Sequence, residues 1–399
     1  MVPKLDSEIG IFVYSTKFKG IGGKIKSSVK DFFVSEILDE KALSKLSKTD
    51  GYAVYKLKKH GIDTNHALSE IYKIHGIRLK ALGLKDANAT TEQFVCSMNR
   101  SMNAVNFSTN RYSLEPLGYL SNPLTKKEMI GNNFKIKIED ASFAEISKFN
   151  EHAHVLNFFG YQRFGSKRPV SHLIGKAILQ SDFERATSLL LSFSSEYDSP
   201  ENTKIRRMLE DKSNYSKVLT EVPPQMDIER VVLSEMIEHG NPLRAIRSMP
   251  ITIRRFFVQA FQSYVFNCTI SSALEYGEEL FLPKSGDVCY DKKGILGRFE
   301  NDPSQRLAVP IVGYSYYKKN RFDFHISKVL EKEQVHAKDF FSKIMQEVSD
   351  EGGFRQTTIK CDNFSISEPK LSFTLSRGSY ATIFLREIMK PQDPIKAGF

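Results

Sequence analysis

The order of the hydrophobic patterns along this chain is the feature that most constrains its fold. Period-two alternation, typical of strands, dominates the first part of the chain, helical spacing takes over from about residue 171, and alternation returns near residue 371. Such segregated runs argue against a doubly wound parallel sheet, in which strands and helices alternate regularly. The order therefore predicts an α+β domain that is interrupted by a mainly helical domain, with its last strands after the interruption.

Local signals define the individual elements that we expect. Strands are predicted where β-formers alternate or cluster, at 32–37, 52–57, 93–96, 134–138, 371–375 and 380–385. The strand at 52–57 is expected to be the neighbour of the strand at 32–37, and residues 131–133 are expected to form a lead-in turn. Apolar residues at helical spacing predict helices at 64–75, 173–180, 183–193 and 254–274. Asp63 or Thr64 can cap the first of these helices, and Gly76 ends it.

The composition bounds the class of protein. The 399 residues include 57 Lys+Arg and 47 Asp+Glu, a net charge of +10, with 41% hydrophobic and 26% charged residues. These are ordinary globular values, which exclude a disordered or collagen-like chain. No apolar run approaches the ~18 residues of a membrane span, and the first residues lack the apolar core of a signal peptide. We therefore expect a soluble cytoplasmic protein.

The cysteines predict reduced thiols rather than disulfides or a zinc site. Their spacing is far too wide for paired metal ligands, and a disulfide framework is not expected in so large a chain. We expect them to pack as small hydrophobic side chains. They are Cys96, Cys268, Cys289 and Cys361.

Motifs for nucleotide and metal binding fail on closer inspection. In 160–167 the lysine follows the serine, whereas a phosphate loop needs Lys before Ser or Thr. Residues 20–23 lack the third glycine of a dinucleotide fingerprint. His152 and His154 have no further His or Cys at ligand spacing, so we predict no metal site. The positive net charge favours an anionic partner, and nucleic acid is one of several such partners.

The segment 83–93 places a carboxylate, a lysine and several hydroxyls in a turn between a helix and a strand. Turns on rigid scaffolds commonly present reactive side chains. Asp86, with Lys85 beside it, can act as an ionised nucleophile or as a base. The competing interpretation is that Asp86 caps its own turn through the backbone. The local sequence leaves both interpretations open.

A second cluster, at 157–168, combines four aromatic residues, three cations and two glycines. Aromatic faces stack unpaired bases at ~1–3 kcal/mol per base, and cations follow phosphates. The alternative is an aromatic turn packed in the core with a solvated basic edge. The spacing of the aromatic residues fits neither a strand nor a helix, so it does not separate the two interpretations.

Taken together, these segments resemble the TruD family of tRNA pseudouridine synthases. The resemblance rests on short sequence motifs that are distributed over most of the chain, at 26–36, 63–65, 83–93, 131–134, 157–165, 261–267 and 378–387. The segment 157–165, Asn-Phe-Phe-Gly-Tyr-Gln-Arg-Phe-Gly, is long enough to be specific by itself. In two places the sequence departs from the family: Val29 stands where members commonly have Pro, and Ala87 and Asn88 stand where a basic residue is usual.

The resemblance implies a fold and an activity. The fold is an α+β catalytic domain on an antiparallel sheet, formed by residues 1–170 and 351–399. A family-specific, mainly helical domain is inserted at 171–350. The activity is isomerisation of a uridine in tRNA to pseudouridine, typically uridine 13 in the D arm, and it requires no cofactor and no metal.

The resemblance also implies roles for single residues. Asp86 is the expected catalytic carboxylate and has to be ionised, a form that a nearby cation favours. Lys26 is the candidate for that cation. Phe159 is expected to stack on the target uracil, which leaves its helical stack to be reached. Asn157 is expected to orient Asp86 or the base edge.

Neighbouring side chains are expected to bind the RNA, namely Lys85, Tyr161, Gln162, Arg163, Lys167 and Arg168. We expect tRNA as the partner, no membrane, no obligate protein partner and a monomer. One alternative is a tRNA-binding or tRNA-folding chaperone of the same fold without catalysis, against which the intact Asp86, Phe159 and Lys26 argue. Another is an enzyme that acts on a small anionic molecule, which predicts little affinity for tRNA.

Overall fold

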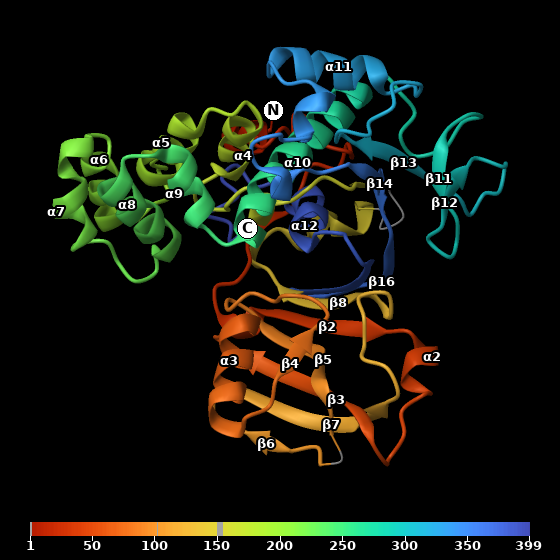
Figure 1. Cartoon of the computed structure of the whole chain (residues 1–399). Helices are drawn as coiled ribbons and strands as arrows, with labels where there is room; N and C mark the ends of the chain where they lie inside the picture. Colours follow the sequence, from red (N-terminus) through yellow and green to blue (C-terminus); the bar gives the residue numbers. More distant parts are fainter. Residues whose placement is uncertain (1, 102, 150–154) are drawn as a thin grey trace.

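The computed structural model describes residues 2–101, 103–149 and 155–399, and His152 and His154 lie outside the described residues. The strands of its main sheet are β2 (Phe32–Leu38), β3 (Gly51–His60), β4 (Leu79–Ala81), β5 (Thr90–Ser101), β6 (Phe107–Ser108), β7 (Tyr112–Leu120), β8 (Met129–Lys137), β16 (Cys361–Ser367) and β17 (Lys370–Ser376). They follow the order β16-β17-β8-β2-β5-β3-β7-β6, with β4 paired to β5. All neighbours are antiparallel except β2 and β5. Helices gather above this sheet in Figure 1, so the predicted α+β class is confirmed.

Two local expectations about the sheet were wrong. The strand at 52–57 lies in β3, but β5 separates β3 from β2. Alternation reveals which residues face the core, not which strand lies alongside, because β5 pairs with β2 on one edge and β3 on the other. Residues 131–133 are not a turn but lie within β8, where they pair with both β2 and β17.

Helix α3 (Thr64–His75) begins and ends where the sequence predicts. The Asp63 carboxylate accepts a hydrogen bond from the backbone N–H of His66 at 3.1 Å, which caps the first turn. Gly76 has φ +69, the left-handed conformation that ends many helices. Ala67 and Ile71 are fully buried in a small core beneath the sheet, so this helix is fixed against the strands that carry the site.

The helical part consists of α4 (Ser171–Leu179), α5 (Phe183–Ser192), α6 (Pro200–Met208), α7 (Tyr215–Leu219), α8 (Asp227–His239), α9 (Pro242–Ser248), α10 (Ile251–Glu275) and α11 (Asp323–Lys332). The three helices predicted in this region correspond to α4, α5 and α10 within a few residues. In Figure 1 α10 runs through the centre of this part, with α4 to α9 on one side and α11 above. None of the helices in the described ranges combines the length and apolarity that a bilayer span requires.

Residues 380–385 form the start of a helix, α12 (Ala381–Met389), and not the predicted strand. The segment is rich in β-branched and aromatic residues, which favour a strand when read locally. Every residue of α12 is buried, and its polar residues Thr382, Arg386 and Glu387 recur at helical spacing, a period that a segment ending at residue 385 does not include. Phe384 packs on Phe373 of β17 with the ring centroids 4.9 Å apart, which fixes α12 against the sheet.

Smaller sheets connect the parts of the chain. A four-stranded sheet has the order β12-β11-β13-β14, and two further pairs are β1 with β9 and β10 with β15. Their bounds are β1 (Gly22–Lys24), β9 (Glu139–Ala141), β10 (Val155–Leu156), β11 (Val288–Tyr290), β12 (Leu296–Arg298), β13 (Arg306–Ile311), β14 (Gly353–Gln356) and β15 (Thr358–Ile359). Pairing of β13 with β14 crosses the expected boundary at residue 350, and one hydrophobic core extends from Leu5 to Phe399. The insertion at 171–350 therefore shares its packing with the sheet domain, and the division itself stays a prediction.

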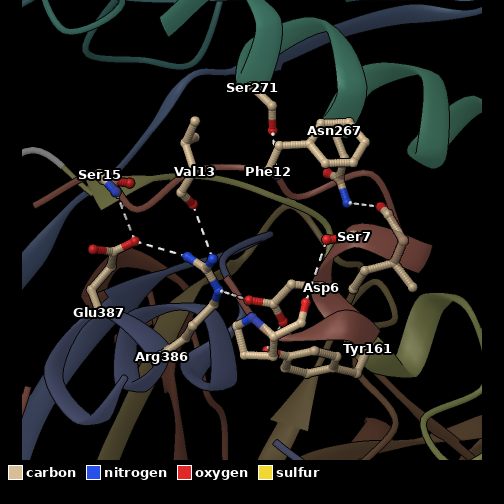
Figure 2. Close-up of polar contacts among 12 residues, drawn as sticks. Asp6, Ser7, Phe12, Val13, Ser15, Tyr161, Asn267, Ser271, Arg386 and Glu387 are labelled. Atoms are coloured by element: carbon tan, nitrogen blue, oxygen red, sulfur yellow. Dashed lines mark hydrogen bonds and ion pairs between the residues drawn. The ribbon is translucent and has the colours of Figure 1, made fainter. Parts of the chain in front are cut away.

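The N-terminal segment is tied to the C-terminal helix by a buried ion cluster (Figure 2). Asp6, in α1 (Lys4–Glu8), pairs with Nε of Arg386 in α12 at 2.6 Å and accepts a hydrogen bond from the Tyr161 hydroxyl at 2.7 Å. Glu387 binds Nη1 of Arg386 at 3.0 Å and accepts from the backbone N–H of Ser15. Asp6 and Arg386 are both 0% exposed. Although burial opposes it, the carboxylates of Asp6 and Glu387 hold the pKa of Arg386 above its ordinary value.

The same segment also bonds to α10. The Asn267 amide donates to the carbonyl of Ile9 at 3.0 Å, and the Ser271 hydroxyl donates to the carbonyl of Gly10 at 3.1 Å. Figure 2 shows both side chains pointing from α10 towards this strand-like segment. The four cysteines, one of them on α10, are buried, and no disulfide joins the described residues, as predicted.

We expect Asp6→Asn to lower the free energy of unfolding by ~3–5 kcal/mol, because removing one partner leaves a buried guanidinium without its main counter-charge. Urea unfolding followed by circular dichroism measures this change. Lys4→Gln is the matched control, since it removes an exposed pair with Glu8 at 3.7 Å in the same helix. The control should change stability by less than ~1 kcal/mol. Equal effects of the two substitutions would show that the buried cluster does not hold the chain ends together.

Candidate active site

Asp86 lies in the loop between β4 and β5, and a buried lysine holds the backbone of this loop. The ammonium of Lys59, on β3, donates to the carbonyl oxygens of Ile62 at 2.8 Å, Lys85 at 3.1 Å and Asp86 at 2.9 Å. Lys59 is 1% exposed. Burial lowers its pKa to about 8, against the opposing charges of Asp63 and Asp86. The loop is therefore fixed from beneath by a single charged group.

Two more buried side chains hold the same loop. The Thr64 hydroxyl, in the first turn of α3, accepts from the backbone N–H of Lys85 at 2.9 Å. It also donates to the Gln93 side chain at 2.9 Å, and the Gln93 amide donates to the carbonyl of Gly83 at 3.0 Å. The backbone of 83–86 is thus bound on both sides, so the position from which the Asp86 side chain extends is fixed.

The Asp86 side chain itself is exposed. Across the described ranges, no hydrogen bond joins its carboxylate to the backbone, so Asp86 is not the cap of its own turn. Lys26 precedes β2 in the left-handed conformation, φ +59, with its ammonium 4.9 Å from the centroid of the Phe32 ring. Burial lowers the pKa of Lys26, and the Asp86 carboxylate opposes that shift. Lys26 and Asp86 therefore lie close enough to interact electrostatically.

Lys85 points away from the surface on which Asp86 lies open. Its ammonium donates to the side-chain oxygen of Asn132 at 2.6 Å and pairs with Glu36 at 3.2 Å, and the two charged side chains are 11% and 0% exposed. Burial raises the pKa of Glu36, an effect that Lys85 opposes. The expected RNA contact of Lys85 is corrected to a structural role, because its charge compensates a buried carboxylate.

Tyr161 and Arg168 are also corrected to structural roles. Tyr161 is 1% exposed, and its hydroxyl is bound to Asp6. The guanidinium of Arg168 pairs with Glu229 at 3.1 Å and donates to the carbonyl of Phe193 at 2.8 Å. Burial lowers the pKa of Arg168 to about 10. The polar groups of both side chains are bound within the protein, so neither side chain is available to contact RNA.

The remaining expected RNA contacts stay accessible to different degrees. Lys167 is exposed, whereas Gln162 and Arg163 are partly buried. The Gln162 side chain accepts a hydrogen bond from the hydroxyl of Thr382 on α12 at 3.5 Å. Lys167 is therefore the open cation of this group, and Arg163 belongs to the aromatic cluster described next.

Phe159 is enclosed by cations and rings and is only 6% exposed. The guanidinium carbon of Arg355 lies 4.0 Å from its ring centroid, and that of Arg163 lies 5.5 Å away. The ring of Tyr380 approaches at 6.3 Å between centroids, and the absence of a side chain on Gly160 permits this, since a Cβ there would lie 2.9 Å from the Tyr380 ring. A uracil can stack directly on Phe159 only if one of these neighbours moves.

Arg355 is the residue that connects Asn157 to this cluster. Its Nη2 donates to the Asn157 side-chain oxygen at 2.8 Å, and its Nε donates to the Asn157 carbonyl at 2.9 Å. The Asn157 amide donates in turn to the carbonyl of Gln356 at 3.2 Å. In the described structure Asn157 thus orients Arg355 rather than Asp86. The sequence gives no signal for Arg355, which lies in the short strand β14 outside every motif.

The two groups of side chains attach to adjacent strands of the main sheet. Asn132, which binds Lys85 beside Asp86, lies on β8 opposite Leu375 of β17. Just beyond the end of β17, the carbonyl of Gly378 accepts from Nη2 of Arg355 at 2.9 Å. The loop of Asp86 and the cluster around Phe159 are therefore linked through β8 and β17.

Known proteins of one kind match this chain over its whole length. Curated relatives that carry the name tRNA pseudouridine synthase D include proteins of Methanococcoides burtonii and Pyrococcus furiosus, each 30% identical. The alignments cover 99% and 97% of this chain and 99% and 100% of the relatives. A solved structure of a TruD protein from Methanosarcina mazei has a TM-score of 0.79 at 26% identity, with 99% of both chains covered.

The fold and these likenesses define an isomerase of the pseudouridine synthase class. A family model described as tRNA pseudouridine synthase D (TruD) matches residues 8–388, and the chain belongs to this family. The reaction of the family is the formation of pseudouridine in tRNA.

The position of Lys59 predicts a pH dependence of turnover. As pH rises through about 8, the ammonium loses a proton and one of its three N–H donors, so the loop of Asp86 loosens. We expect the single-turnover rate to fall in this range, and Lys59→Met to be ~10-fold slower or more, because small misplacements of a reacting group are costly. The variant should lack the decline near pH 8. A decline that persists unchanged in Lys59→Met would assign it to another group.

Unfolding does not explain such a decline. The pKa of Lys59 is lower in the folded chain, about 8, than the ordinary value of roughly 10.4 for an unfolded chain. Between these values the unfolded chain binds the extra proton, so this group makes folding more favourable as pH rises. Thermal unfolding measured across the same pH range is the control.

Lys85→Met tests the corrected role of Lys85. We expect the free energy of unfolding to fall by about 3 kcal/mol, because the buried Glu36 carboxylate loses its partner. The salt dependence of tRNA binding should stay unchanged. Lys167→Met is the matched control with the reverse expectation, since removing an exposed lysine that contacts phosphate reduces the magnitude of the salt slope by about 1 without a loss of stability. A reduced salt slope in Lys85→Met would restore its RNA-binding role.

Proposed function

We propose that this enzyme isomerises a uridine of tRNA, uridine 13 in the D arm, to pseudouridine. The reaction breaks the C1′–N1 bond, turns the uracil and forms the C1′–C5 bond. C5 loses its proton and N1 gains one, so no oxidant, reductant or water is consumed. The observation that carries the proposal is the exposed carboxylate of Asp86, presented on a loop that buried Lys59, Thr64 and Gln93 hold by its backbone.

In this proposal Asp86 acts as the ionised carboxylate. It adds to C1′ or to C6, or it takes a proton from the ribose, and each of these roles requires the charged form. Lys26 supports this role because its ammonium places an opposite charge near the Asp86 carboxylate. The fixed loop backbone supports the reaction by reducing the number of positions that the carboxylate samples before the substrate arrives.

The target base is received by the cluster around Phe159. A uracil within a folded tRNA has to leave its stack before its C1′–N1 bond can be reached. Phe159 and Tyr380 offer aromatic surfaces on which an unpaired base gains ~1–3 kcal/mol. Because Phe159 is covered by Arg355, the uracil enters only as Tyr380 or Arg355 gives way.

Mapping pseudouridine at nucleotide resolution in unmodified tRNA transcripts tests this function. Wild type should form pseudouridine at position 13, and Asp86→Asn should form none while binding tRNA with an affinity within a few-fold of wild type. Asp140→Asn is the matched control, because Asp140 is an exposed aspartate of the short strand β9 outside the site, and we expect full activity.

Retained isomerisation by Asp86→Asn would rule out the proposed role of this residue. Pseudouridine at another position would support the proposed reaction but would show that uridine 13 is not the target. If no protein forms pseudouridine in any tRNA although all bind it, the chaperone hypothesis takes precedence.

A further inference from the structure

We propose that Arg355, together with Arg163, forms an anion site that binds a backbone phosphate of the tRNA beside the target nucleotide. The inference rests on the proposed function, which brings tRNA to the cluster around Phe159. The sequence predicts an RNA contact for Arg163 and gives no signal for Arg355, and the pairing of the two as a phosphate site comes from the contacts of their guanidinium groups.

The charge of Arg355 has no counter-ion in the described part of the chain. Its partners are neutral oxygens: the carbonyl and side-chain oxygens of Asn157, the carbonyl of Gly378 at 2.9 Å and that of Phe158 at 3.5 Å. Other arginines with little exposure are paired with carboxylates, such as Arg386 with Asp6 at 2.6 Å. Arg355 therefore keeps a full positive charge in a place where burying one is costly.

Arg163 adds a second cation that has no counter-ion within the described ranges of the chain. Its Nε is buried and has no hydrogen-bond partner among the described residues. Its guanidinium carbon lies 5.5 Å from the ring centroid of Phe159 and 5.4 Å from that of Phe256. An unpartnered buried donor is expensive, and native structures rarely leave one unless a ligand or water completes it.

The two charges act on each other. Burial, assisted by the neighbouring charge of Arg163, lowers the pKa of Arg355 to about 10. A mononegative phosphodiester between them would remove both penalties. It also fits the chemistry of the donors, since the planar guanidinium binds phosphate oxygens through paired N–H groups.

Donors remain available for such a ligand. The described hydrogen bonds of Arg355 use Nε and Nη2, and none uses Nη1. Nε and Nη2 are fixed by four backbone and side-chain oxygens, so Nη1 is held in a defined direction. A uracil carbonyl could accept from it as well, but a neutral acceptor would leave both charges without compensation, which favours phosphate.

The site also lies where the target nucleotide has to be. Gly378, which binds Arg355, follows the end of β17, and β17 pairs with the part of β8 that binds Lys85 next to Asp86. A phosphate held by Arg355 would thus lie near the part of β8 and β17 that the Asp86 loop contacts through Lys85. Binding there would orient the sugar of the flipped nucleotide relative to the carboxylate.

The test measures tRNA affinity against salt concentration in the Asp86→Asn background, in which bound tRNA is not converted. A plot of log affinity against log salt concentration has a negative slope. We expect Arg355→Gln and Arg163→Gln each to reduce the magnitude of this slope by about 1. Each should weaken binding ~10-fold, the usual effect of losing a hydrogen bond to a charged group. Arg163→Gln loses no described hydrogen bond, so it keeps the test valid if Arg355→Gln fails to fold.

Arg111→Gln is the matched control, because this exposed arginine is already paired with Glu70 at 2.6 Å far from the cluster. It should leave the slope unchanged. A second arm replaces the phosphates on either side of the target uridine, one at a time, by neutral methylphosphonates. One of the two replacements should weaken binding to the Asp86→Asn protein about 10-fold. The same replacement should not weaken binding to the Arg163→Gln variant of that protein any further, because the contact is already lost.

Unchanged salt slopes in both variants, or equal losses with every methylphosphonate in parent and variant, would overturn the phosphate site. If Arg355→Gln in the enzyme that retains Asp86 reduces turnover while the salt slope is unchanged, Arg355 only supports Phe159, and the phosphate site is likewise overturned. These outcomes are distinct from failure of the proposed function, which shows as no pseudouridine made by wild type.

Discussion

The buried pairing of Asp6 with Arg386 is the interaction on which the positions of the other parts depend. It joins the two ends of the chain, and Tyr161 adds the loop that follows Phe159 to the same group of charges. Asn267 of α10 accepts from the backbone N–H of Phe159 at 2.8 Å while it binds Ile9, so the central helix belongs to the same polar network. Because none of these groups reaches water, each requires its partners to be in place, and the N-terminal segment, α10, α12 and the site loop can only assemble together.

The basic side chains near the site fall into two groups. Some stabilise the fold through internal partners, and others have charges that a ligand could compensate. Lys59 holds three carbonyl groups and Lys85 compensates Glu36, so both support the Asp86 loop from within. Arg355 and Arg163 lack such compensation and line the place where a base and its phosphate would enter. The sequence shows all four only as basic residues, with Arg355 outside every motif, and only their partners reveal which charges the fold has already compensated.

The parts of the fold that the sequence predicts are those in which local chemistry decides. The cap at Asp63 and the end at Gly76 define α3, and alternation defines β2 and β8. Predictions failed where the environment decides instead. The segment 380–385 favours a strand by its residue types, but in the fold it becomes the start of a helix whose every residue is buried. Residues 131–133, expected as a turn, belong to β8 because β2 and β17 provide hydrogen-bond partners on both sides.

The sequence by itself determined the class of the fold, the helices α3, α4, α5 and α10, and the strands β2, β3, β5, β8 and β17. It also determined the segments that form the site, with Asp86 in a turn and Phe159 in an aromatic cluster. Only the tertiary structure decided the order of the strands, the burial of Tyr161 and Arg168, and the entry of Arg355 into the cluster from a distant strand. The physical reason is that capping and periodicity act between residues a few positions apart, whereas desolvation and ion pairing depend on which segments meet. Asp6 and Arg386, at opposite ends of the chain, are the clearest example of that difference.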